Sequence, residues 1–109
     1  MIYISGIVEL DEDDKRNCGA AFADAEHYLK HDVQVYEDTE IINSHARIKE
    51  LRDAGKITDM RSEMLVRINM LSQCDKIYML KGWETSQVSR AEYEYARAVG
   101  MRYVYSKKF

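Results

Sequence analysis

The sequence contains no proline, only two cysteines, Cys18 and Cys74, and no apolar run of the length that a membrane span requires. A span takes about 20 consecutive apolar residues, so we expect no membrane as a partner. Two cysteines fit neither a disulfide framework nor a zinc site. We therefore expect two buried free thiols in a cytoplasmic protein, since thiols stay reduced in the cytoplasm. Without proline, the loops must rely on glycine and on side-chain caps.

Basic residues are not in excess either. The chain has 16 Lys and Arg against 19 Asp and Glu, a net charge of −3, whereas a basic stripe marks a nucleic-acid-binding surface. His27, His31 and His45 are scattered along the sequence, and we expect them to face solvent. They form no grouped set of metal ligands with cysteines or carboxylates. We therefore expect no nucleic-acid partner, no metal and no cofactor.

The apolar residues that are present suffice for one small domain. Of the 109 residues, 46% are apolar and 32% are charged, which is the balance of a globular protein. This length allows one compact domain over 1–109 but not two. Nearly continuous apolar runs at 2–5, 33–36, 76–80 and 102–105 predict buried strands.

Helical patterns separate these strands. An apolar stripe from Cys18 to Leu29 predicts a helix whose start Asp13 or Asp14 would cap. Similar signals predict a second helix around 46–54 and a third that begins near Asp59. Strands that alternate with helices pair in parallel through right-handed crossovers. We therefore expect an α/β fold: a Rossmann-like or flavodoxin-like open parallel sheet of about four to five strands, with helices on both faces.

The last predicted helix carries the richest candidate site. Ser86 would cap its start and Gly100 would end it. Glu92 lies in its second turn and borders the predicted inward stripe. That stripe consists of Val88, Ala91, Tyr95, Ala98 and Val99. A carboxylate held there could act as a nucleophile or general base, but most helical glutamates are merely solvated. The spacing leaves both interpretations open, and Ser86 equally fits a plain N-cap.

Ligands of an open parallel sheet bind beyond the carboxyl ends of its strands, where helix N-termini favour anions. This rule selects Ser5 with Gly6, residues 36–38, and residues 82–89. Trp83 could stack on a base or simply pack, with neither favoured. Asp75 falls at the opposite end of the sheet, where we expect it to cap or tether a turn. The candidate substrate-binding residues are Ser5, Gly6, Gly82, Trp83, Ser86, Ser89 and Arg90.

The stretch CDKIYMLKGWETS at 74–86, followed by Glu92, Ala96 and Gly100, resembles a pattern in small bacterial and phage proteins. The segment IYISG at 2–6 and an FxxAExxL arrangement that begins at Phe22 match as well. Those proteins are grouped with the nucleoside 2-deoxyribosyltransferase-like fold. They are related to the deoxynucleoside 5′-monophosphate N-glycosidases.

This resemblance implies a five-stranded Rossmann-like domain that forms homodimers or higher homo-oligomers. It implies that Glu92 is a catalytic nucleophile at the anomeric carbon of a sugar, and that Tyr3 orients it. Ser86 matches a serine that contacts phosphate in the glycosidases, which favours a nucleotide over a nucleoside. Arg67 aligns with the acid that assists the leaving base in the transferases, and a cation there could instead bind phosphate. Glu84 and Asp59 are other possible acids.

We therefore expect N-glycosidic bond cleavage or deoxyribosyl transfer on a nucleotide or nucleoside. The alternative is a catalytically silent nucleotide-binding protein, a sensor or a sequestering protein. A third possibility is a small interaction protein with an aromatic dimer surface, although the same residues fit core and sheet positions better. These residues are Tyr93, Tyr95, Tyr103 and Tyr105.

Overall fold

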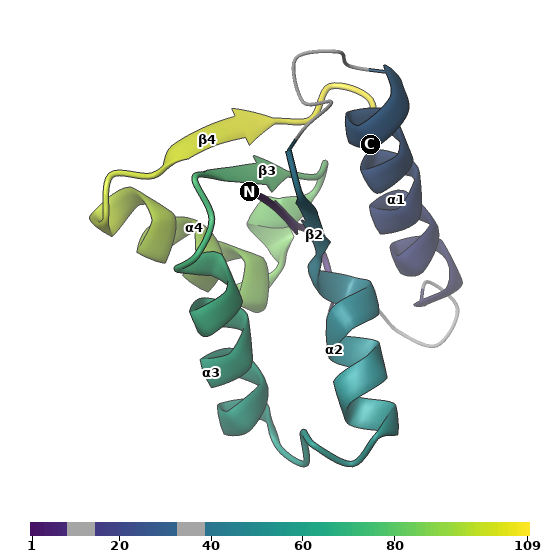
Figure 1. Cartoon of the computed structure of the whole chain (residues 1–109), viewed down its shortest axis with the longest axis vertical. Coiled ribbons are helices and arrows are strands. Elements are labelled where there is room, and N and C mark those ends of the chain that lie inside the picture. Colours follow the sequence, from purple (N-terminus) through teal and green to yellow (C-terminus); the bar gives the residue numbers. More distant parts are fainter. Residues whose placement is uncertain (9–14, 33–38) are drawn as a thin grey trace.

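In the computed structural model, the described residues form one sheet of four parallel strands in the order β2-β1-β3-β4 (Figure 1). The structure describes residues 1–8, 15–32 and 39–109, except for the side chains of 15–18 and 32. This strand order is that of flavodoxin-like sheets and confirms the predicted α/β fold. The strands are β1 (Ile2–Ser5), β2 (Ile41–Asn43), β3 (Lys76–Met79) and β4 (Arg102–Tyr105).

Helices connect the strands and cover both faces of the sheet (Figure 1). A π-helical turn extends the first helix, and a short 3-10 turn precedes the last one. The helical elements are α1 (Lys15–His27), η1 (Tyr28–Asp32), α2 (Ser44–Asp53), α3 (Met60–Leu71), η3 (Trp83–Thr85) and α4 (Gln87–Ala98). None of the helices in the described part of the chain is long and apolar enough to cross a membrane.

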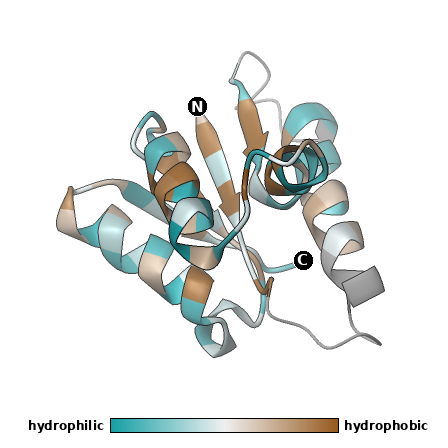
Figure 2. Ribbon diagram, turned by 90° about the horizontal axis from the view of Figure 1, so that it is seen from below, coloured by the Kyte–Doolittle hydropathy of each residue, from teal (hydrophilic) through white to brown (hydrophobic). Residues whose placement is uncertain are grey.

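Alternate side chains of β1 and β3 point to opposite faces and divide the core into two layers. The layer under α1 contains Ile2, Ile4, Phe22, Ala25, Leu29, Ile41, Tyr78 and Leu80. The layer under α3 and α4 contains Tyr3, Leu71, Cys74, Ile77, Met79 and Ala96. Colouring by hydropathy shows the apolar strands between the helices (Figure 2). Cys74 is a buried free thiol, as predicted, and burial raises its pKa to about 11.

Most element boundaries agree with the predictions. β1 and β4 match, and β3 ends one residue early, at Met79. Asp59 caps α3 in a reciprocal capping box with Ser62, and Gly55 follows α2 with φ +73°. The predicted strand at 33–36 and the caps at Asp13 or Asp14 lie outside the described residues. β2 was not predicted, because three residues give too short a pattern.

The buried face of α4 differs from the predicted stripe. Val88 is buried as predicted, but Ala91, Ala98 and Val99 are exposed, Val99 at 57%. The residues that α4 buries are Val88, Ser89, Glu92 and Ala96. The helix is turned so that two polar side chains face the sheet, because they find hydrogen-bond partners there. Glu92 therefore lies within the buried face and not at its border.

The exposure of two tyrosines agrees with the predictions in part, whereas that of His45 does not. Tyr103 and Tyr105 lie in the sheet, as expected, but on its edge strand β4, where they are 48% and 47% exposed and outside the core. The hydroxyls of Tyr93 and Tyr105 lie 2.7 Å apart. His45 is half-buried against Phe22, with ring centroids 5.4 Å apart, and does not face solvent freely. Burial, reinforced by nearby cations, lowers the pKa of this histidine.

Candidate functional site

The candidate site lies at the carboxyl ends of β1 and β3. The chain leaves β1 toward β2 on one side and leaves β3 toward β4 on the other, so the strand order reverses between these two neighbours. Such a reversal opens a crevice at the carboxyl edge, and ligands of flavodoxin-like sheets bind there. Ser5 is the last residue of β1, and the first turn of α4 follows β3 closely. The topology thus brings β1 and α4 together at the edge where ligands are expected.

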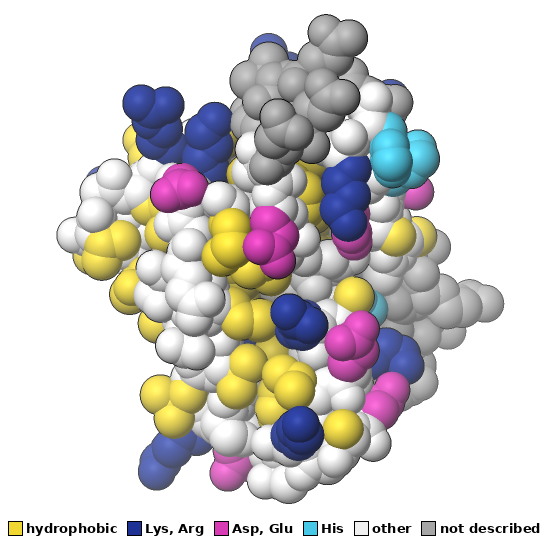
Figure 3. Space-filling model, in the orientation of Figure 1, with side chains coloured by type: hydrophobic (Ala, Val, Ile, Leu, Met, Phe, Trp, Pro, Cys, Tyr) yellow, Lys and Arg dark blue, Asp and Glu magenta, His cyan; other side chains and the backbone are white. Residues whose placement is uncertain are grey.

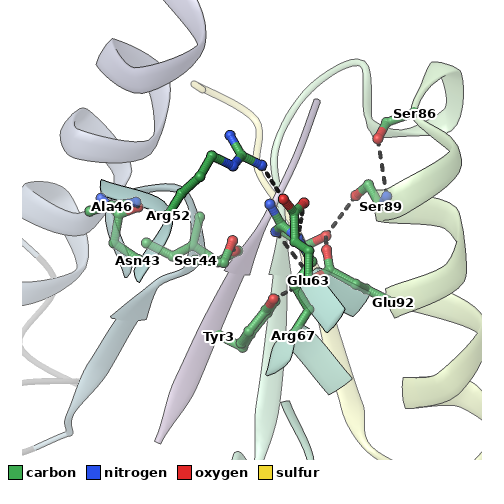
Figure 4. A network of polar contacts seen from close by, with 12 residues as sticks. Tyr3, Asn43, Ser44, Ala46, Arg52, Glu63, Arg67, Ser86, Ser89 and Glu92 are labelled. Atoms are coloured by element: carbon green, nitrogen blue, oxygen red, sulfur yellow. Dashed lines mark hydrogen bonds and ion pairs between the residues drawn. The ribbon is translucent and has the colours of Figure 1, made fainter. Parts of the chain in front are cut away.

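The start of α4 is fixed by its cap. Ser86 is the N-cap, and its Oγ accepts a hydrogen bond from the backbone N–H of Ser89 at 3.0 Å. Both serines are fully buried. The cap sets the helix rotation that places Ser89, and Glu92 one turn later, against the end of β1 (Figure 4).

Glu92 is 1% exposed and is held by hydroxyl groups from β1. The Tyr3 hydroxyl donates to its Oε2 (Figure 4). Ser5 Oγ donates to its Oε1 at 2.7 Å. Ser5 Oγ also lies 2.6 Å from Ser89 Oγ. Since the Ser5 proton goes to Glu92, Ser89 is the donor in that second contact. The Ser89 hydroxyl thus donates to Ser5, and the Ser5 and Tyr3 hydroxyls together orient the Glu92 carboxylate.

A chain of alternating charges approaches the same carboxylate from the other side. Arg67 is 2% exposed, and its Nη1 lies 3.6 Å from Glu92 Oε2. Its Nε donates to Glu63 Oε2 at 3.0 Å, and the exposed Arg52 contacts the other oxygen of Glu63. Two arginines and two glutamates from α2, α3 and α4 thus compensate one another's charge, as a buried cluster must.

The ionisation of the site follows from burial and these contacts. Burial raises the pKa of the Glu92 carboxyl above its ordinary value; the charge of Arg67 and the hydrogen bonds from Tyr3 and Ser5 offset this only in part. Burial, with the nearby Glu92 carboxylate, raises the pKa of the Tyr3 phenol well above its usual range, so Tyr3 remains a donor. Burial alone would lower the pKa of Arg67, but the neighbouring anions, Glu92 foremost, raise it.

The structure brings five of the predicted site residues into one network: Tyr3, Ser5, Ser86, Ser89 and Glu92. The other predicted residues have different surroundings. A Cβ on Gly6 would meet Leu80 Cδ1 at 2.9 Å, so this glycine allows β1 to approach the residue after β3. Gly82 has φ +83°, which favours glycine, and starts the turn into η3.

Trp83 and Arg90 lie apart from this network. They line a hollow of about 400 Å³ over η3 and the outer side of α4. The ring centroids of Trp83 and Tyr93 lie 4.5 Å apart there. A second hollow of about 210 Å³, beside β2 and α2, is lined largely by polar residues, among them Glu26, Glu40 and Glu50. Neither of these hollows includes Tyr3 or Glu92 in its lining.

Glu63, Arg52 and Ser44 belong to the network but were not predicted. Ser44 Oγ donates to the Ile4 carbonyl at 2.7 Å and anchors the start of α2 to β1. Glu63 and Arg67 are four residues apart, a spacing typical of helical ion pairs, and that signal was available in the sequence. The other possible acids, Asp59 and Glu84, are exposed, and Asp59 serves as the cap of α3.

Among the described side chains, Glu63, Arg67 and Glu92 are the only charged ones that are buried. Acidic and basic side chains are interspersed over the face shown in Figure 3. Within the described residues, no group of three or more His, Cys, Asp or Glu could hold a metal ion. Asp75 accepts a hydrogen bond from the Met1 amino group at 2.8 Å, which confirms its predicted role as a tether.

Comparison with known proteins places the chain in a family but attaches no activity to it. No curated protein and no solved structure matches the sequence. A family model described as "Domain of unknown function (DUF4406)" matches residues 1–105, nearly the whole chain. The strands, the capped helix α4 and the network around Glu92 all lie within this match. The protein therefore belongs to the DUF4406 family.

Proposed function

We propose that the protein cleaves an N-glycosidic bond, or transfers a deoxyribosyl group, on a nucleotide or nucleoside, with Glu92 as the nucleophile. One observation carries this proposal: a glutamate that is 1% exposed at the switch point of the sheet, oriented by Tyr3 and Ser5. Fixed hydroxyl donors and a guanidinium around a buried carboxylate are typical of pre-organised catalytic groups. The resemblance to nucleoside 2-deoxyribosyltransferase-like proteins supports the same assignment.

In the proposed reaction, a Glu92 oxygen attacks the anomeric carbon while the bond from that carbon to the base breaks. The electron pair of the broken bond leaves with the base. The transition state carries positive charge on the sugar, which the nearby carboxylate stabilises and then captures as an ester. Water, or a second base in a transfer, next attacks the ester and frees Glu92. Tyr3 and Ser5 hold the carboxylate in place throughout.

The start of α4 favours a nucleotide as the substrate. Backbone N–H groups and the helix dipole at this end attract anions, and Ser86 adds a hydroxyl. This serine stands six residues before Glu92, as in the 5′-monophosphate glycosidases that the sequence resembles.

We also propose that the protein is cytoplasmic and forms a homodimer or a larger assembly. The exposed tyrosines of β4 support the assembly, since aromatic residues are enriched at protein interfaces.

A silent nucleotide-binding protein is the second candidate, and burial is the observation that favours it. Both Glu92 oxygens already accept hydrogen bonds, and the carboxylate offers almost no surface to a ligand in this conformation. A substrate reaches Glu92 only if the residues that cover it move. In the silent protein, Glu92 would serve structure alone.

Free-base release separates the two candidates. The purified protein is incubated with ribo- and deoxynucleosides and their 5′-monophosphates, beside the Glu92→Gln and Glu94→Gln variants. Glu94 is the matched control, because it lies two residues away on the exposed side of α4. We expect release by the wild type and Glu94→Gln, and a loss of about 10⁴-fold in Glu92→Gln.

Two other results would decide against this proposal. Equal release by Glu92→Gln would exclude Glu92 as the nucleophile. No release from any substrate, together with nucleotide binding in calorimetry, would favour the silent protein. If calorimetry also shows no binding, both candidates are wrong.

A further inference from the structure

The network contains a buried cation with unused hydrogen-bonding capacity. Among the described residues, Arg67 Nη1 has no hydrogen-bond partner, although the side chain is only 2% exposed. Its distance of 3.6 Å to Glu92 Oε2 allows Coulombic attraction but is too long for a hydrogen bond. A buried donor without a hydrogen-bond partner destabilises the fold, so such groups are rare in native proteins and each one requires an explanation.

The reaction proposed above requires a group that stabilises the departing base. When the bond from sugar to base breaks, the base takes the electron pair and becomes negatively charged unless it receives a proton. Within the described part of the network, the one other carboxylate is Glu63. Both of its oxygens accept from arginines, which leaves neither to carry a proton toward a ligand. A guanidinium cannot act as the acid, because it does not give up its proton in proteins.

We propose that Arg67 is a catalytic residue whose Nη1 donates a hydrogen bond to the departing base, which leaves as an anion. This inference rests on the proposed function. The ligand class is a purine or pyrimidine nucleotide whose base presents a ring nitrogen or a carbonyl oxygen beside the glycosidic nitrogen. Arg67 thus stabilises the departing base electrostatically, whereas a carboxylic acid in the same role would protonate it.

The charges and atoms of this step balance. Glu92 gains a bond to the anomeric carbon and loses its negative charge, while the electron pair of the broken bond makes the base anionic. The guanidinium then pairs with the base anion and no longer with Glu92. Hydrolysis of the ester consumes one water, whose hydroxide goes to the sugar and whose proton goes to the base. The network regains its resting charge when both products leave.

The surroundings of Arg67 suit this exchange of partners. Its Nε is fixed by Glu63, and Arg52 fixes Glu63 from the surface side. These contacts orient the planar guanidinium without using Nη1. A donor that is already oriented in a dry site loses little energy to reorganisation when negative charge develops next to it.

The test compares two substrates that differ in the charge of the departing base. Deoxyguanosine 5′-monophosphate releases guanine as an anion, whereas its N7-methyl derivative is already cationic and releases a neutral base. We expect Arg67→Met to lower kcat/KM about 100-fold for the unmethylated substrate and much less for the methylated one. Arg97→Met, on the exposed side of α4, is the control and should change neither value. For a pyrimidine-specific enzyme, the pair is deoxyuridine 5′-monophosphate and its 5-fluoro derivative, which releases the more stable anion.

Each outcome decides the inference. Equal losses on both substrates would overturn it, since that result means that Arg67 acts only by holding Glu92. Unchanged kinetics would overturn it as well. If Arg67→Met does not fold, Arg67→Lys keeps the charge. It should again lower kcat/KM more for the unmethylated substrate than for the methylated one, but by a smaller factor. A wild-type protein that releases no base from any substrate overturns the proposed function together with the inference, whereas equal losses in an active enzyme overturn the inference alone.

Discussion

The two ends of the sheet each carry an ion pair between distant parts of the chain, but in different surroundings. At the amino end, the Met1 amino group meets Asp75 at 2.8 Å, and the Asp75 side chain is 86% exposed. At the carboxyl end, Arg67 and Glu92 lie 3.6 Å apart and are almost completely buried. Water and salt screen the first pair, whereas little screens the second.

This difference shows why the carboxyl end is the functional candidate. Removing two charges from water costs several kcal/mol for each ion, and well-packed apolar residues of similar volume are often at least as stabilising. Stability alone therefore gives no reason to bury Arg67 and Glu92 between α3 and α4. The proposed chemistry at Glu92 would supply such a reason, whereas the exposed tether at the other end needs none.

Removing the buried cation should have the largest effect on stability. Arg67→Met leaves Glu92 without its counter-charge, and we expect a loss of about 3–5 kcal/mol near neutral pH. Urea unfolding measures this loss. Arg97→Met, which removes an exposed partner of Glu94, should cost less than about 1 kcal/mol. Similar losses in the two variants would remove the distinction between buried and exposed pairs.

The loss in Arg67→Met should also depend on pH. Arg67 lowers the pKa of Glu92, so without it the pKa, already raised by burial, rises further. A folded-state pKa above the unfolded value means that folding binds protons, and stability falls as the pH rises through the folded pKa. The deficit of Arg67→Met should therefore shrink below the ordinary glutamate pKa, where Glu92 is neutral in both states. A deficit that grows toward acid pH would contradict this assignment.

A smaller effect is expected from the hydroxyl that orients the carboxylate. Tyr3→Phe removes a buried donor to Glu92, which should cost about 1–3 kcal/mol of stability. That hydrogen bond lowers the pKa of Glu92, so its loss should move the acidic limb of the pH profile of kcat/KM to higher pH. Base release measured across pH tests the shift. Tyr103→Phe, on the exposed edge strand, is the control, and a limb that stays in place in Tyr3→Phe would exclude the orienting role.

The sequence predicted the scaffold of the site better than its interior. Short apolar runs and caps are local signals, which is why β1, the start of α3 and the Ser86 cap were predicted. The buried face of α4 was not predicted correctly. The prediction assumed that apolar residues face inward, whereas the helix also buries Ser89 and Glu92. A polar side chain is buried when tertiary partners satisfy it, and periodicity contains no information about those partners.

The same reasoning explains what was missed around Glu92. Its partners come from β1, 87 and 89 residues away, and from α3, so no local pattern links them. Arg67 was noticed only through the family resemblance, and Glu63 was overlooked although it lies one helical turn before Arg67. An acidic residue and a basic residue at this spacing usually lie on a solvated face. Only the fold shows that both are buried here.

The smallest effect is expected at the amino end. The hydrogen bond from the Met1 amino group, together with the attraction of its charge, lowers the pKa of Asp75. The stabilisation that this pair gives to the fold is therefore present above the ordinary aspartate pKa and is lost as the pH falls through the lowered folded-state pKa. Asp75→Asn should therefore change the unfolding midpoint at neutral pH far less than Tyr3→Phe does, because solvent already screens this pair. Base release should stay at the wild-type rate, since Asp75 precedes β3 at the amino end of the sheet and Glu92 lies at the carboxyl end. A loss of activity as large as that of Tyr3→Phe would mean that the two ends of the sheet are coupled, and the site would then extend beyond the carboxyl edge.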